Sequence, residues 1–289
     1  MDAIGYVIKK SGTSSFFVEP EIYDFMNWIK NMADSLNIEI LPEVHADYSI
    51  QYALAEHGFW IYDFILPHMI LNTIFFRRQS ELYKYLASRS DRQFTMLDCH
   101  DGIPVKPDVD NLINESDAIA IVEKCMKRGA SVTRIVNNEH NDFDVHQIAC
   151  TFYLALGCDD DAYIAARAIQ FFVPGIPQVY YVGLLAEGND ANRVKKTKDV
   201  RDVNRHNFSI EEIEVNLDKN VVKRLINLIR FRNDSRFFDG RYTFVDCPDN
   251  QVQLKCSIGG DYCLLKIDLS NFKTIIVCCE DSNETEIEI

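Results

Sequence analysis

The chain has 289 residues, of which 47% are hydrophobic, so it is long enough to bury a sizeable core, and we expect one large domain and one small one. Its net charge of −14 argues against a nucleic-acid or membrane partner, because anionic phosphates are bound by concentrated lysine and arginine. The sequence shows no signal peptide and no apolar run of membrane-spanning length, and its nine cysteines are irregularly spaced, so we expect reduced thiols and a cytoplasmic location.

From residue 1 to about 235, short β-like runs alternate with helical periods, which is typical of parallel βα units. The predicted strands are rich in β-branched or aromatic residues and are followed by polar loops; they cover 38–44, 59–64, 94–98 and 177–182. Amphipathic helices are predicted between them at 20–36, 50–57, 81–87, 115–128 and 162–172. The first 235 residues are therefore predicted to form an α/β structure.

The pattern changes after this part. Short strands separated by turn signals are predicted at 241–246, 251–257, 262–268 and 273–279, and Gly259-Gly260 is typical of a hairpin turn. The segment 236–289 is therefore predicted to be a small antiparallel β domain.

Several carboxylates directly follow the predicted strands: Glu43, Asp63, Asp98 and Asp101, with Asp2 where a preceding strand would end. In a (β/α)8 barrel such residues converge on one face. Retaining glycosyl transfer needs a pair of this kind, one carboxylate as nucleophile and one carboxylic acid about 5 Å away. The same acids could instead cap helices or bind loop amides, and spacing alone leaves both interpretations open.

Five ordered segments resemble those that carry the active site in sucrose phosphorylases of the alpha-amylase clan; they read MDAIGYVIKKSGTS, ILPEVHADY, FTMLDCHDGIPV, YLALGCDDDAYIAARAIQFFVPGIPQVYYVGLLAEGND and VRDVNRHNFS. The resemblance runs from residue 1 through at least residue 235. It implies the second half of a (β/α)8 TIM barrel followed by a small β domain. It also implies a hexosyltransferase that converts sucrose, or sucrose 6'-phosphate, and inorganic phosphate into glucose 1-phosphate and fructose, or fructose 6-phosphate.

Carried over position by position, the resemblance gives roles to individual residues. Asp2 would be the nucleophile that forms a glucosyl-enzyme, and Glu43 the general acid and then the general base. Asp101 would stabilise the oxocarbenium-like transition state. His100 would bind the same sugar ring, and His45 would contact the acceptor.

The resemblance also identifies residues of the acceptor and phosphate side. Asp144 and Gln147 match positions that contact the glucosyl or fructosyl group, and Arg201 matches an arginine associated with phosphate. His146 stands where typical sucrose phosphorylases have a tyrosine. A histidine resembles the branch that acts on sucrose 6'-phosphate, because an imidazolium can pair with the phosphate; alternatively, His146 is a solvated loop residue.

The sequence departs from the family in one respect, since the segments that precede the nucleophile's strand are absent from it. This predicts a truncated or split form, and an upstream-encoded N-terminal half would be its partner. The alternatives are a non-catalytic remnant and a phosphorylase for another α-glucoside, such as glucosylglycerate or glucosylglycerol. No metal or organic cofactor is implied, and the acidic run at 159–161 is interpreted as a helix start rather than a calcium site.

Overall fold

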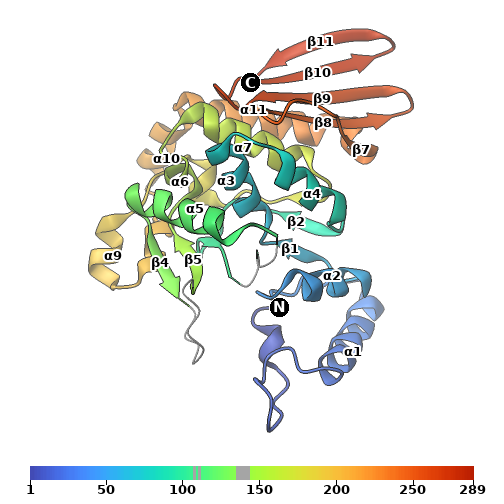
Figure 1. The fold of residues 1–289 in the computed structure, drawn as a ribbon, viewed down its shortest axis with the longest axis vertical. Helices are drawn as coiled ribbons and strands as arrows, with labels where there is room; N and C mark the ends of the chain where they lie inside the picture. Colours follow the sequence, from blue (N-terminus) through green and yellow to red (C-terminus); the bar gives the residue numbers. More distant parts are fainter. Residues whose placement is uncertain (107–108, 110–111, 135–143) are drawn as a thin grey trace.

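The computed structural model describes residues 1–106, 109, 112–134 and 144–289 (Figure 1). Helices α1 (Glu21–Ser35) and α2 (Tyr48–Glu56) lie at one end of the molecule, and a five-stranded sheet lies at the other. The remaining helices lie between these two ends. None of the described helices is both long and apolar enough to cross a membrane.

A parallel sheet occupies the middle of the chain. It contains β1 (Ile61–Asp63), β2 (Gln93–Thr95) and β6 (Ile176–Pro177) in the order β1-β2-β6. Since parallel strands end at the same edge, the residues that follow β1, β2 and β6 lie on one side of the molecule.

Backbone hydrogen bonds extend this sheet toward the N-terminus. The Trp60 amide donates to the Ile40 carbonyl at 3.3 Å. The Glu43 amide donates to the Met1 carbonyl at 2.7 Å, and the Met1 amino group donates to the Leu41 carbonyl at 2.8 Å. This last pair of bonds is the pattern of a parallel bridge. The segments at 1–2 and 40–43 therefore continue the sheet beyond β1.

The five predicted helices are all confirmed, within a few residues at their ends: α1, α2, α4 (Ser80–Ser88), α5 (Glu115–Lys127) and α7 (Asp160–Phe172). The interpretation of 159–161 as a helix start is also confirmed, because the Asp159 side chain accepts a hydrogen bond from the Ala162 amide at 3.0 Å. Helix α3 (Leu66–Phe76) was not predicted. All its residues from Leu66 to Ile74 are buried, so its sequence has no polar face.

The prediction of one strand over 177–182 is wrong beyond its first residue. Strand β6 ends at Pro177, and a one-turn helix, α8 (Tyr181–Leu184), follows. The turn brings Gly183 against a buried ion pair, where an added Cβ would lie 2.1 Å from an Asp98 oxygen and 2.3 Å from an Arg167 nitrogen. Packing around this glycine overrides the β-propensity of the aromatic residues before it.

The other elements between residues 100 and 240 were not predicted. Strands β3 (Ile103–Pro104), β5 (Val145–Ala149) and β4 (Ser131–Arg134) form an antiparallel sheet in that order. The helices are α6 (Phe152–Ala155), α9 (Ala191–Thr197), α10 (Ile210–Leu217) and α11 (Asn220–Asp234). Short 3-10 turns lie at η2 (Val200–Asn204) and η3 (Arg236–Asp239) in this part of the chain, and another, η1 (Ile4–Tyr6), lies near the N-terminus.

The C-terminal strands form one antiparallel sheet in the order β11-β10-β9-β8-β7. Their bounds are β7 (Arg241–Phe244), β8 (Gln251–Ile258), β9 (Asp261–Asp268), β10 (Thr274–Glu280) and β11 (Asn283–Glu288). The predicted hairpin turn is confirmed: Ile258 pairs with Asp261, and Gly259 and Gly260 have φ of +59° and +101°. The division of the chain at residue 235 stays a prediction.

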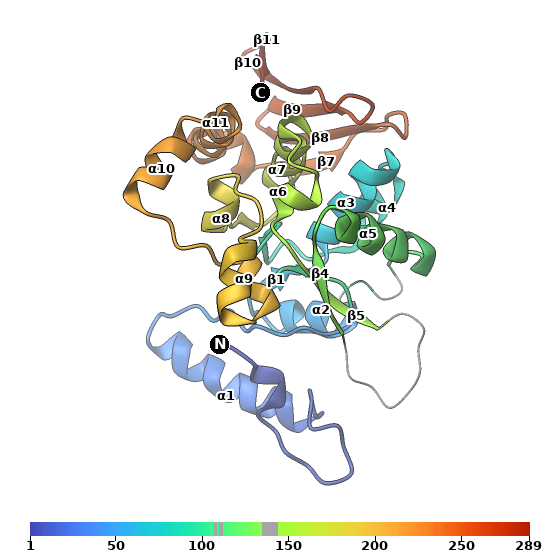
Figure 2. The same cartoon turned by 90° about the vertical axis from the view of Figure 1, so that its left-hand side faces the viewer.

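Two apolar clusters make up most of the core. The larger one joins α3, α7 and α11 to the inner faces of β8, β9 and β10. A separate cluster joins α1 and α2 through Ile22, Met26, Leu54 and Phe59. Figure 2 shows α1 apart from the helices that lie next to the C-terminal sheet. Residues of the parallel sheet region belong to both clusters, since Ile61 of β1 is in the smaller one and Leu97, after β2, is in the larger one.

Candidate active site

Three of the predicted site residues converge at the carboxyl ends of the parallel strands. Glu43, His45 and Asp101 each place one oxygen or nitrogen within 4.8 Å of the others. His45 Nε2 lies 3.9 Å from Glu43 Oε1, and the His45 ring stacks on Phe64 with centroids 4.0 Å apart. All three side chains are partly buried, with exposed fractions of 17–25%. Two carboxylates and an imidazole that lie this close together can exchange protons with a bound substrate.

The same three side chains offer one ligand atom each, so they could hold a divalent cation. The expectation that no metal is used therefore stays a prediction.

Asp101 is held by two arginines. Arg205 Nη2 lies 3.0 Å from Asp101 Oδ1, and Arg201 Nη1 lies 3.4 Å from the same oxygen. Arg205 Nε also donates to the His100 carbonyl at 2.9 Å. The His100 ring is 55% exposed, with Nε2 3.5 Å from Asp101. The predicted His100, Asp101 and Arg201 are thus brought together.

Arg201 is the more accessible of the two guanidinium groups, with 44% of its side chain exposed against 25% for Arg205. Its hydrogen bond to Asp199 raises the pKa of Arg201. Arg205 was missed by the sequence analysis. The signal was the second arginine in VRDVNRH, four residues after Arg201. Arg201 is on the short turn η2, and Arg205 directly follows that turn.

Asp2 lies on the segment that runs beside Glu43, because the Glu43 amide donates a hydrogen bond to the Met1 carbonyl. Its side chain is exposed, and its carboxylate is not a member of the cluster of Glu43, His45 and Asp101. The nucleophile predicted from the resemblance is therefore next to the cluster along the backbone, and its role stays a prediction.

The acceptor-side residues lie on or beside β5. The His146 ring packs edge-on against His45, with centroids 5.7 Å apart, and its Nδ1 lies 2.6 Å from the Lys106 carbonyl. His146 is therefore adjacent to the carboxylate cluster. Asp144 forms an ion pair with Arg134 instead, and Gln147 is buried in the β3-β5-β4 sheet with 4% of its surface exposed.

Two other acids that follow strands are structural. Asp63 accepts from Arg89 at 2.7 Å and from the Leu66 amide at 3.0 Å, where it caps the start of α3. Arg167 Nη2 lies 2.9 and 3.0 Å from the two carboxylate oxygens of Asp98. All four charged side chains are fully buried. For Asp63 and Asp98, the structural interpretation of strand-end acids is correct.

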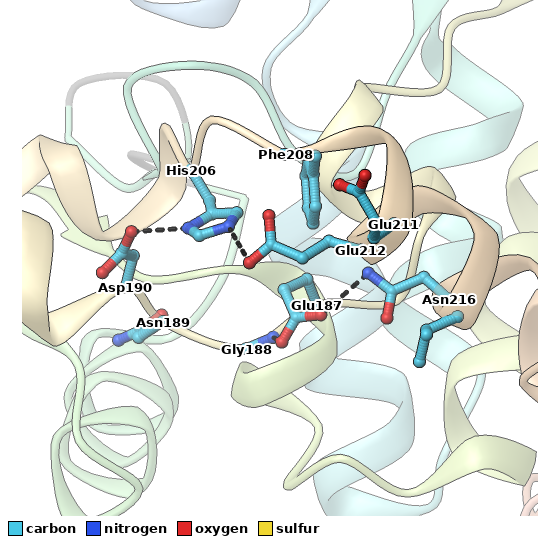
Figure 3. Close-up of a pocket in the computed structure, with 10 residues that line it drawn as sticks. Glu187, Gly188, Asn189, Asp190, His206, Phe208, Glu211, Glu212 and Asn216 are labelled. Atoms are coloured by element: carbon cyan, nitrogen blue, oxygen red, sulfur yellow. Dashed lines mark hydrogen bonds and ion pairs between the residues drawn. The ribbon is translucent and has the colours of Figure 1, made fainter.

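A pocket of about 400 Å³ lies next to this site and does not include the carboxylate cluster; Glu187, Asp190, His206, Phe208, Glu212 and Asn216 are among its lining residues (Figure 3). The His206 ring lies between Asp190 and Glu212. Burial acts to lower the pKa of His206, but its hydrogen bonds and charge interactions with these two carboxylates raise it above the ordinary value.

No protein-family model matches the chain, but close relatives exist. Sucrose 6(F)-phosphate phosphorylase of Thermoanaerobacterium thermosaccharolyticum is 54% identical over 287 residues, which is 98% of this chain and 59% of that protein. Glucosylglycerol phosphorylase of Marinobacter adhaerens is 41% identical over 283 residues, covering 97% of this chain and 58% of that protein. The chain thus spans about three-fifths of the length of these relatives, and it matches the C-terminal part of the first.

Comparison with solved structures leads to the same relative. The crystal structure of sucrose 6F-phosphate phosphorylase from Thermoanaerobacter thermosaccharolyticum superposes with a TM-score of 0.97 at 54% identity, over 99% of this chain and 59% of that one. The alpha-amylase of H. orenii gives a TM-score of 0.58 at 15% identity, over 88% of this chain and 49% of that one, which shows the fold alone. The predicted fold, part of a TIM barrel followed by an antiparallel sheet, is confirmed.

Proposed function

The chain is homologous to the C-terminal part of sucrose-phosphorylase-type enzymes, and from this premise we propose that it supplies the reacting carboxylates of a retaining α-glucosyl phosphorylase. The observation that carries the proposal is the convergence of Glu43 and Asp101 at the strand ends, within 4.8 Å of each other. In a chain of this descent, one carboxylate of this pair can protonate the leaving oxygen and the other can favour the positively charged transition state, while Asp2 lies on the neighbouring segment as the proposed nucleophile.

In the proposed reaction, the Asp2 carboxylate attacks the anomeric carbon while the Glu43 carboxylic acid protonates the leaving glycosidic oxygen. This gives a β-glucosyl-enzyme. Inorganic phosphate then attacks the same carbon and displaces the Asp2 carboxylate, Glu43 takes up the phosphate proton, and α-glucose 1-phosphate leaves with retained configuration. Asp101, kept in place by the two arginines, would bind sugar hydroxyls and favour the positively charged transition state.

The charges around the cluster are compatible with an anionic acceptor. Arg201 is close to half exposed, so its guanidinium can turn to a phosphate that enters between the strand ends. Arg205 is more buried, and its Nε is already bonded to a carbonyl group. We therefore propose phosphate binding for Arg201 and a supporting role for Arg205.

Sucrose 6'-phosphate is our first choice of donor, because His146 lies against His45 at the acceptor side and can pair with a phosphorylated fructosyl group when protonated. The name of the relative at 54% identity agrees with this choice. A glucosylglycerol donor is the second candidate, since a phosphorylase for that compound is 41% identical over 97% of the chain. We also keep the proposal that the site requires a segment equivalent to the N-terminal part of the relatives, as a partner or in the same chain.

The cytoplasmic location belongs to the proposal as well. It is supported by the nine cysteines, all of which carry free thiols.

The test is complementation. The part of the Thermoanaerobacterium relative that precedes its match to this chain is joined ahead of Met1, and release of glucose 1-phosphate is measured with sucrose 6'-phosphate, sucrose and glucosylglycerol. We expect turnover that requires phosphate, is fastest with sucrose 6'-phosphate and is abolished by Asp101→Asn. His57→Gln is the matched control, because His57 directly follows α2, its Nδ1 bonds the Ala53 carbonyl and its ring stacks on Tyr23, and none of these residues belongs to the carboxylate cluster. A folded complemented enzyme that releases no glucose 1-phosphate from any of the three donors would refute the proposal and favour the non-catalytic alternative.

A further inference from the structure

His206 bridges two carboxylates that are themselves fixed. Its Nδ1 lies 2.6 Å from Asp190 Oδ2, and its Nε2 lies 3.4 Å from Glu212 Oε1 (Figure 3). Both ring nitrogens can donate at once only in the imidazolium, so this arrangement favours the protonated ring. The neighbouring Phe208 ring packs against it in a T-shaped arrangement, with centroids 4.6 Å apart.

Each carboxylate uses its other oxygen to cap a helix. Asp190 Oδ1 accepts from the Arg193 amide at 2.8 Å at the start of α9. Glu212 Oε2 accepts from the Ser209 amide at 2.7 Å, as part of the capping box of α10. The protonated ring therefore ties the beginnings of α9 and α10 together. Its own backbone carbonyl accepts from the Tyr181 hydroxyl at 2.8 Å.

The segment that ends at His206 carries the contacts to Asp101. Arg205, the preceding residue, bonds both the His100 carbonyl and Asp101. The Asn204 side chain donates to the Cys99 carbonyl, so two consecutive residues connect this segment to the loop that follows β2. A change in the position of residue 206 would act directly on these bonds.

The charged partners of the His206 ring are the carboxylates of Asp190 and Glu212, and the other charged groups nearby are placed as follows. On α9, Arg193 pairs with Asp202 at 3.5 Å, and Lys196 lines an adjacent cavity that His206 also lines. On the loop before α9, Glu187 pairs with Lys219 at 3.2 Å. Arg205 extends toward Asp101, and Glu211 adds a further negative charge to the pocket wall.

We propose that the His206 imidazolium is a positioning residue, which holds Arg205 against Asp101 by tying the starts of α9 and α10 together. The inference rests on the proposed function for its effect on catalysis, but the structural link can be measured without turnover. Deprotonation removes one of the two donors, so the link should weaken as pH rises through the raised pKa of His206.

The first experiment uses the chain itself. The Arg205 Nε proton is followed by NMR at a fixed pH near 6.5, and its protection from exchange with water is compared in the parent, His206→Gln, His206→Arg and His57→Gln. Loss of a charge-assisted hydrogen bond is worth about tenfold or more in an equilibrium, so we expect protection to fall at least about tenfold in His206→Gln. His206→Arg keeps two donors and a permanent charge, so it should retain protection, as should the control His57→Gln.

The second experiment uses the complemented enzyme. The parent kcat should decline at alkaline pH as His206 loses its proton. In His206→Gln, kcat should be about tenfold lower at neutral pH and should lack this decline. His206→Arg should restore kcat and remain flat.

Parent-like protection of the Arg205 Nε proton in His206→Gln would overturn the inference, as would a pH profile that the substitution leaves unchanged. If protection falls as expected while no enzyme variant turns over any donor, the proposed function is wrong and the structural link stands.

Discussion

Replacing Arg167 with methionine tests whether the ion pair behind the site is required for the fold around it. Both Arg167 and Asp98 are fully buried, and Arg167 reaches both carboxylate oxygens at 2.9 and 3.0 Å. Removing one partner of a buried pair leaves an uncompensated charge and costs about 3–5 kcal/mol. In urea unfolding near pH 7, we therefore expect Arg167→Met to lower the free energy of unfolding by about 3–5 kcal/mol with the same denaturant dependence.

The loss of unfolding free energy in Arg167→Met should also depend on pH. Burial raises the pKa of Asp98, and the charge and hydrogen bonds of Arg167 oppose that effect. In Arg167→Met the opposition is gone, so Asp98 takes up a proton at a higher pH than in the parent. A group whose pKa is raised by folding contributes stability below its unfolded pKa and loses it as pH rises through the folded value. The stability difference between parent and variant should therefore be smaller near pH 5 than near pH 8.

Two further variants make this test decisive. Asp98→Leu combined with Arg167→Met replaces both charges by apolar groups and should recover most of the lost stability. Lys223→Met removes an exposed pair with Asp218 and should cost nothing measurable. A loss below about 1 kcal/mol in Arg167→Met, or a double variant no more stable than the single one, would refute the reasoning.

Three shorter predictions concern the site. Gly183→Ala puts a Cβ 2.1 Å from an Asp98 oxygen, so the melting temperature should fall by several degrees; an unchanged value would mean that α8 moves freely. In the complemented enzyme, Asp2→Asn should abolish turnover of glucosyl fluoride, whereas Glu43→Gln should spare it, because fluoride leaves without a proton; equal losses would contradict these roles. His146→Tyr should lower the kcat/KM ratio of sucrose 6'-phosphate to sucrose by about ten- to a hundredfold, and an unchanged ratio would argue against phosphate recognition by His146.

The elements that the sequence predicts well are those with local signals. Helix α7 begins where three aspartates meet an amphipathic run, and the C-terminal hairpin is marked by Gly259-Gly260. Helix α3 carries no such signal, since burial on all sides removes its polar face. In the β3-β5-β4 sheet, β3 pairs with a strand more than forty residues later, and local sequence pattern does not report such a pairing.

The residues of the site also differ in how well the sequence predicts their roles. Asp63, Asp98 and Asp101 all follow predicted strands, and sequence position alone does not separate them. They differ in their partners. Asp63 and Asp98 form fully buried ion pairs with Arg89 and Arg167, whereas Asp101 faces arginines from a segment about a hundred residues later. Resemblance identified Asp101 and Arg201, and only the geometry added Arg205 and His206.

The shared core of α7 and the C-terminal sheet limits how such chains can exchange parts by recombination. One side of α7 packs on β8, β9 and β10, and the same helix carries Arg167, the partner of Asp98 in the loop that follows β2. A sheet acquired from a distant relative would have to fit α7 closely, or the shift would reach Asp98, three residues before Asp101. Crossover points inside this layer should therefore be rare among functional hybrids, and the helix and the sheet are expected to be inherited together.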